Sequence, residues 1–173
     1  MWVFVMNADG KLMDMLTGYA ASHQHPVNIF VHMIGIPTIM LGVFIPLTWI
    51  GFEVSDIRVS LAHILLLVFF LFYLTLDVLF AAVFAVGAFF LILLAEKLGA
   101  YPGNTAWYIA AACFICGYIA QFIGHAIEKS MPVLIKHPIQ ANLAAPFFTV
   151  VELFKLTGLR EDLFDTVQSR IKS

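Results

Sequence analysis

The chain has 173 residues, of which 62% are hydrophobic and only 12% are charged. Soluble domains have roughly 45–50% apolar and about 25% charged residues, and a domain of this size buries only about 70% of the surface of its unfolded chain. The composition therefore excludes a water-soluble monomer and a disordered chain, and it indicates an integral membrane protein. The net charge of −2 gives no basic surface for nucleic acid, and two cysteines are too few for a disulfide framework.

A short amphipathic helix is predicted near the start of the chain, over residues 11–22. Its apolar positions, Leu12, Met15, Leu16 and Tyr19, recur at helical spacing and form one face. Such a face either lies on the membrane surface or packs against the rest of the protein, and the sequence leaves both arrangements open.

Four apolar segments follow, and each is predicted to form a helix that crosses the bilayer: residues 26–50, 59–76, 78–97 and 105–127. A crossing helix needs about 20 residues, with a range of roughly 17–25. The second and third segments come from one continuous apolar stretch that we divide at Asp77, because a lone carboxylate in the middle of a bilayer is costly. The alternative is a single very long helix with Asp77 buried midway.

The remainder of the chain is mixed in character. Residues 140–156 are apolar but include Pro146 and Glu152, which favours an interfacial or half-buried helix over a fifth crossing. Residues 158–173 are charged and amphipathic, so we expect them to lie in water. The predicted fold is therefore all-α: a single membrane domain over residues 1–173, with four transmembrane helices and amphipathic or interfacial helices at both ends.

The distribution of basic residues predicts the orientation in the membrane. Four crossings place both termini on one side, and that side carries seven Lys and Arg residues: Lys11, Lys129, Lys136, Lys155, Arg160, Arg170 and Lys172. The loops on the opposite side carry two, Arg58 and Lys97. Because cytoplasmic loops are enriched in Lys and Arg, we expect both termini in the cytoplasm, in a bacterial inner membrane or in the endoplasmic reticulum. Nothing in the sequence predicts the oligomeric state.

Polar residues are the informative ones in so apolar a chain, because an ionisable side chain inside a membrane is costly. The predicted topology brings six of them to the cytoplasmic ends of the helices: Asn28, His32, Asp77, Gln121, His125 and Glu128. His23 joins them if the chain bends before the first crossing, and Pro26 favours such a bend because it disfavours helix at the residue before it. Segments far apart in the sequence therefore deliver polar groups to one depth of one leaflet.

This convergence predicts a metal site. Neutral imidazole is the commonest metal ligand, and two histidines with one carboxylate form the ligand set of many non-haem Fe(II) oxygenases. Such a set would come from His23, His32 and His125, with Glu128 or Asp77.

Asn28 and Gln121 would suit the orientation of the ligand rings through hydrogen bonds. The other histidines, His25, His63 and His137, lie outside the predicted cluster and are interpreted as ordinary polar or interfacial residues. A histidine near a helix end is commonly no more than a hydrogen-bonded interfacial group, so the hypothesis depends on several of them meeting at one depth.

Two motifs carry a family resemblance. The first is Tyr19-x3-His23-x4-Asn28-x3-His32-x2-Gly35-Ile36-Pro37, and the second is Gln121-Phe-Ile-Gly124-His125-x2-Glu128, followed by Pro132, Ala145-Pro146 and Glu152. Asp77 also follows an aromatic pair, Phe72-Tyr73. Together, from about Leu16 to Leu156, these motifs resemble the 2-hydroxy-palmitic acid dioxygenase family, a group of small polytopic membrane proteins.

The resemblance implies an Fe(II)-dependent enzyme. The fungal member of that family is an endoplasmic reticulum enzyme that acts in the α-oxidation of 2-hydroxy fatty acids during phytosphingosine breakdown, uses O2 and yields a fatty acid one carbon shorter. By that resemblance, His23, His32 and His125 are the expected iron ligands, because they fall on the motif histidines. Many relatives carry a second histidine directly after the last of these, where this chain has Ala126, so the number of ligands stays open.

The same resemblance gives the expected partners: a 2-hydroxy fatty acid, O2 and the lipid bilayer. The acyl chain would lie among the Leu- and Phe-rich helices, and its polar head would reach the cytoplasmic interface, where the polar residues gather.

Three other functions are compatible with these residues. Histidines on two membrane helices can ligate a b-type haem from both faces. The same ligands would activate water in a zinc-dependent membrane hydrolase. A non-enzymatic scaffold or small transporter would need no metal at all.

Overall fold

The computed structural model describes residues 2–21, 23–136 and 138–172. These residues form, in chain order, α1 (Trp2–Ala20), α2 (Pro26–Thr48), β1 (Gly51–Val54), β2 (Ile57–Ser60), α3 (Leu61–Leu74), α4 (Val78–Gly99), α5 (Thr105–Glu128), α6 (Val133–Lys136), α7 (Pro138–Leu156) and α8 (Glu161–Lys172). The chain is mostly helical, as predicted. The antiparallel hairpin of β1 and β2 was not predicted.

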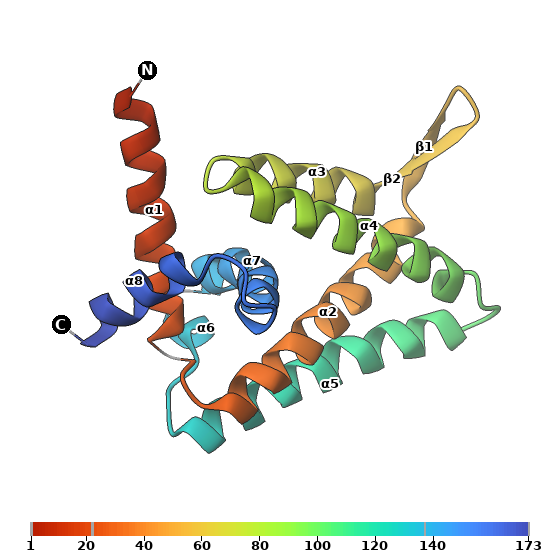
Figure 1. The fold of residues 1–173 in the computed structure, drawn as a ribbon. Coiled ribbons are helices and arrows are strands. Elements are labelled where there is room, and N and C mark those ends of the chain that lie inside the picture. Colours follow the sequence, from red (N-terminus) through yellow and green to blue (C-terminus); the bar gives the residue numbers. More distant parts are fainter. Residues whose placement is uncertain (1, 22, 137, 173) are drawn as a thin grey trace.

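The pairing of α2 with α5 is the most extensive contact between helices, and Figure 1 shows the two lying along each other. Glycines allow the close approach: a Cβ added at Gly42 would lie 2.6 Å from the backbone nitrogen of Phe114, and one added at Gly117 would lie 3.0 Å from the carbonyl oxygen of Gly35. Small residues at such contacts let membrane helices gain dispersion energy through close backbone packing. The contact brings the start of α2 beside the end of α5.

The helices α3 and α4 form an antiparallel pair above α2, as Figure 1 shows. The predicted division at Asp77 is confirmed, because its carboxylate accepts hydrogen bonds from the backbone nitrogens of Leu79 and Phe80 at 2.9 and 3.0 Å and so begins α4. At the other end of α3, Ser60 and His63 form a capping pair, which gives His63 a structural role.

Three helices of the described chain are long and apolar enough to cross a membrane: α2 extended to Trp49, α4 and α5. In contrast, α3 has 14 residues, and at about 1.5 Å per residue it is shorter than the roughly 30 Å hydrocarbon core. The predicted crossing over 59–76 is shortened because residues 57–60 belong to β2 and residues 75–77 form the turn before α4. The prediction of four transmembrane helices is therefore not confirmed.

The remaining helices pack on this frame. Helix α7 contacts α2 and α4, and its buried side chains include Phe147, Val151 and Glu152, which agrees with the half-buried helix predicted over 140–156. Helix α8 contacts α1. Within α1 the side chains of Leu12 and Leu16 are buried in the core, which favours packing on the protein over the membrane-surface alternative for this helix.

Candidate metal centre

Three histidines from separate segments meet at one point. His23 lies in the connection between α1 and α2, His32 on α2 and His125 on α5. Their ring centroids are 4.5 to 4.9 Å apart, all three residues are buried, and the nitrogens they offer lie within 4.8 Å of one another. The bend that brings His23 over the start of α2 is the predicted one, because His25 has an extended backbone and Pro26 begins the helix.

Hydrogen bonds fix the orientation of the three rings. His23 Nδ1 donates to the carbonyl oxygen of Tyr19 at 2.8 Å, and His32 Nδ1 donates to that of Asn28 at 2.9 Å. A carbonyl oxygen only accepts, so the proton sits on Nδ1 and the lone pair on Nε2 in both rings. His125 Nδ1 contacts the Ser130 hydroxyl at 2.9 Å. Metal-binding histidines are commonly held in this way through the nitrogen that does not bind the metal.

The residues present fit a divalent metal ion. His23 Nε2 is buried and has no hydrogen-bond partner among the described residues, which is a costly arrangement unless something binds it. Burial lowers the pKa of His23 to about 4, so its imidazole is neutral at physiological pH and its lone pair is available. Within the described chain, His23, His32 and His125 are the only group of three or more His, Cys, Asp or Glu residues placed to share an ion.

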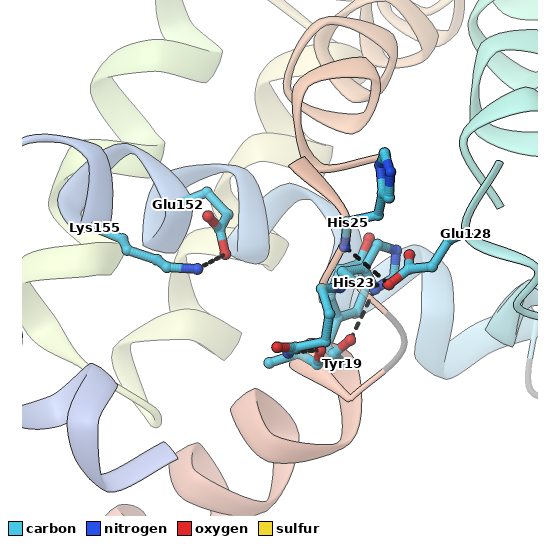
Figure 2. A network of polar contacts seen from close by, with 8 residues as sticks. Tyr19, His23, His25, Glu128, Glu152 and Lys155 are labelled. Carbon is cyan, nitrogen blue, oxygen red and sulfur yellow. Dashed lines mark hydrogen bonds and ion pairs between the residues drawn. The ribbon is translucent and has the colours of Figure 1, made fainter. Parts of the chain in front are cut away.

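Glu128 lies beside this group but its carboxylate is occupied by other partners. One oxygen accepts from the backbone nitrogens of Gln24 at 2.5 Å and His25 at 3.1 Å, and the other accepts from the side-chain amide of Asn28. Figure 2 shows Glu128 next to the segment that carries His23 and His25. These contacts tie the connection between α1 and α2 to the end of α5, and so they hold His23 in place.

Asp77 lies apart from the histidines. Its second carboxylate oxygen is 2.5 Å from Arg160 Nη1, and the Arg160 guanidinium lies over the Phe80 ring, 4.8 Å from its centroid. Its ion pair and its helix cap account for both oxygens. The structure therefore does not bring Asp77 to the cluster as a ligand, although the sequence allows either Asp77 or Glu128 as the carboxylate ligand.

Aromatic rings form the wall behind His23. Tyr19 stacks on His23 with ring centroids 4.0 Å apart, and Phe148 of α7 packs against both rings, with centroids 4.0 Å from Tyr19 and 5.3 Å from His23. Burial, with a smaller effect from the nearby Glu152 carboxylate, raises the pKa of Tyr19 well above its usual value. Burial also raises the pKa of Glu152, and Lys155, 3.5 Å away, opposes that effect. Figure 2 shows the ion pair of Glu152 and Lys155 on α7.

A cavity of about 330 Å³ opens from the histidines. Its apolar wall is made by α2, α3, α4, α5, α6 and α7 and includes Ile36, Ile39, Met40, Val43, Phe44, Leu65, Leu66, Phe69, Phe84, Phe122, Leu134 and Ala145. From His32 to Phe44 the α2 face extends about 18 Å at roughly 1.5 Å per residue. Among the described residues that line the cavity there is no Asp, Glu, Lys or Arg. The arrangement suits a long apolar ligand with one polar end.

Comparisons with known proteins place the chain in a family. Residues 10–156 match the family described as Mpo1-like, 2-hydroxy-palmitic acid dioxygenase Mpo1-like. The chain belongs to the Mpo1-like family. It is similar to the Saccharomyces cerevisiae protein named 2-hydroxy-palmitic acid dioxygenase MPO1, with 31% identity over 147 residues that cover 84% of this chain and 81% of the relative. No solved structure gives a significant match.

The region that matches the Mpo1-like family contains all three histidines and runs from α1 through α7. Arg160 and α8 lie beyond it. Sequence reasoning missed Ser130, which follows α5 and contacts the His125 ring, and its five-residue separation from His125 offered no helical pattern to find it. Gln121 lines the cavity one turn before His125, and within the described part of the chain it makes no hydrogen bond to a histidine ring. His137 lies outside the described residues.

Proposed function

We propose that this chain is a membrane dioxygenase that uses Fe(II) and O2 to convert a 2-hydroxy fatty acid into the fatty acid one carbon shorter. The observation that carries the proposal is the position of three buried imidazoles at one end of an apolar cavity. Family membership supports the same class of reaction, because the yeast relative is named as a 2-hydroxy-palmitic acid dioxygenase.

The three histidines would hold the iron through Nε2, the nitrogen opposite the one that already takes part in a hydrogen bond. Three protein ligands leave further coordination positions open for substrate and oxygen. Bound Fe(II) would supply the activation of O2 and a Lewis-acid site for the polar end of the substrate. Glu128 positions His23 in this proposal and does not bind the metal.

The apolar cavity would hold the hydrocarbon part of the substrate. Its acyl chain would lie along the α2 face between Ile36 and Phe44, where burial of each methylene contributes about 0.8 kcal/mol. The polar end then faces His32 and His125. With O2 as oxidant the atoms balance: the acid RCH(OH)COOH and O2 give RCOOH, CO2 and H2O, so that no further reductant is required.

The test is turnover of 2-hydroxypalmitate by the purified chain in lipid nanodiscs, supplied with Fe(II) under anaerobic conditions and then exposed to O2. We expect O2 uptake and formation of pentadecanoate, with equal molar amounts of the two. Activity with zinc and no O2 uptake would contradict the proposal and favour the hydrolase. A Soret band in the visible spectrum of the protein would favour the haem protein instead.

A further inference from the structure

Most polar side chains on the cavity wall already have hydrogen-bond partners. The Tyr118 hydroxyl donates to Asn142 Oδ1 at 3.0 Å, and Asn142 Nδ2 donates to the carbonyl oxygen of Pro138 at 2.8 Å. Gln121 differs, because its Nε2 is enclosed and has no hydrogen-bond partner among the described residues. An amide N–H buried without an acceptor is costly, so an unpartnered donor beside a cavity indicates a ligand that supplies the acceptor.

The packing of the two central helices fixes the position of this amide. Gln121 and His125 are four residues apart on α5 and share one face of the helix. Opposite them, Gly35 of α2 makes room for the amide, because a Cβ at Gly35 would collide with Gln121 Nε2. Gly35 is itself three residues after His32. The amide therefore lies within about one helical turn of two of the three imidazoles, at the polar end of the cavity.

The residues that line the cavity indicate which hydrogen-bond acceptor the ligand supplies to Gln121. No Lys or Arg lies among the described residues that line the cavity, so an entering anion meets no cationic side chain there. A carboxylate is an acceptor only, and its hydrogen bonds are roughly twice as strong as those between neutral groups. We propose that the Gln121 side-chain amide binds the carboxylate of the acyl ligand and so distinguishes a fatty acid from a fatty alcohol. This inference rests on the proposed function, because it takes an acyl acid as the ligand.

The experiment compares two ligands that differ only at C1. Affinities for 2-hydroxypalmitate and 1,2-hexadecanediol are measured anaerobically by competition with a fluorescent long-chain alcohol, on the purified chain in lipid nanodiscs, so that turnover does not consume either ligand. We expect Gln121→Leu to weaken binding of the acid about tenfold and to leave binding of the diol nearly unchanged. Gln121→Glu keeps the size and polarity of the side chain, and its charge is expected to weaken binding of the acid at least as much.

The matched control is Gln140→Leu, because Gln140 lies exposed on α7 and is not part of the cavity wall. It should leave both affinities unchanged. Equal losses for acid and diol in both Gln121 variants, or no loss in either, would overturn the inference. If the acid-to-diol ratio shifts as expected but the chain does not turn over 2-hydroxypalmitate, the carboxylate site stands and the proposed dioxygenase function fails.

Discussion

Glu128 shows how one carboxylate organises the metal centre without joining it. Two backbone nitrogens before α2 and the Asn28 amide on α2 all donate to it. Hydrogen bonds to a charged group contribute about 1.5–3 kcal/mol each, and three of them hold the segment that carries His23 against the end of α5. Residues that orient metal ligands in this way typically affect metal affinity by about 10–100-fold when they are replaced.

We therefore expect Glu128→Ala to weaken Fe(II) binding by about 10–100-fold, because the segment with His23 loses its anchor. Glu128→Gln keeps one acceptor oxygen for the backbone nitrogens and should lose less. Anaerobic titration with Fe(II) measures both affinities. A loss in Glu128→Gln as complete as that in His125→Ala, in a protein that remains folded, would contradict the positioning role and indicate direct ligation.

For single residues, the sequence predicted which side chains come together but not which hydrogen bonds they form. The positions of His32 and His125 within their predicted helices were enough to predict that the two lie close together. The partners of the rings depend on side-chain rotamers and on the backbone after the helix end, which periodicity does not describe. Asp77 was expected near the cluster, but Arg160, 83 residues further along the chain, pairs with it instead.

The contact between α2 and α5 decides where the histidines lie. Backbone atoms of α5 occupy the space that a side chain at Gly42 would need, with Phe114 N at 2.6 Å and Ala110 O at 2.8 Å from the added Cβ. Backbone cannot rotate away as a side chain can, so any larger residue here must separate the two helices. Because His32 and His125 lie on the same two helices, such a separation would also open the metal centre.

We expect Gly42→Ala to destabilise the protein by about 1–3 kcal/mol through overpacking, and to weaken metal binding as well. Gly87→Ala on α4 is the matched control, because a Cβ there meets nothing within 4 Å and should leave stability unchanged or slightly improved. Thermal unfolding of both variants in the same nanodiscs measures the difference. Equal midpoints would show that the helices tolerate the extra methyl group and that the contact is not tight.

Other elements show the limits of sequence patterns. The division of the long apolar run at Asp77 is correct, because a carboxylate that can cap a helix is recognisable from its residue type and its position in the sequence. The hairpin of β1 and β2 was missed because its strands are short and mostly exposed and its turn, Ser55 and Asp56 at φ of 48° and 68°, lacks the usual glycine. The hairpin in turn shortens α3, which is why the second predicted crossing did not appear at full length.

The whole molecule encloses its cavity with parts of many helices. The described wall draws on the helices α1 to α7, and its residues range from Tyr19 to Pro146. Composition predicted an apolar protein, but only tertiary packing places some apolar side chains around a cavity and leaves others, such as Phe90 and Leu67, exposed on the outside of their helices. The orientation of the termini and the fourth crossing stay predictions.

The central claim is that His23, His32 and His125 hold one Fe(II) ion. The direct measurement is the iron content of anaerobically purified protein, compared among the unaltered chain, His32→Ala, His125→Ala and His63→Ala. We expect about one iron ion per chain in the unaltered protein and in His63→Ala, whose ring contacts Ser60 at the start of α3, and almost none in the other two variants. Equal iron in all four proteins would contradict the assigned ligands.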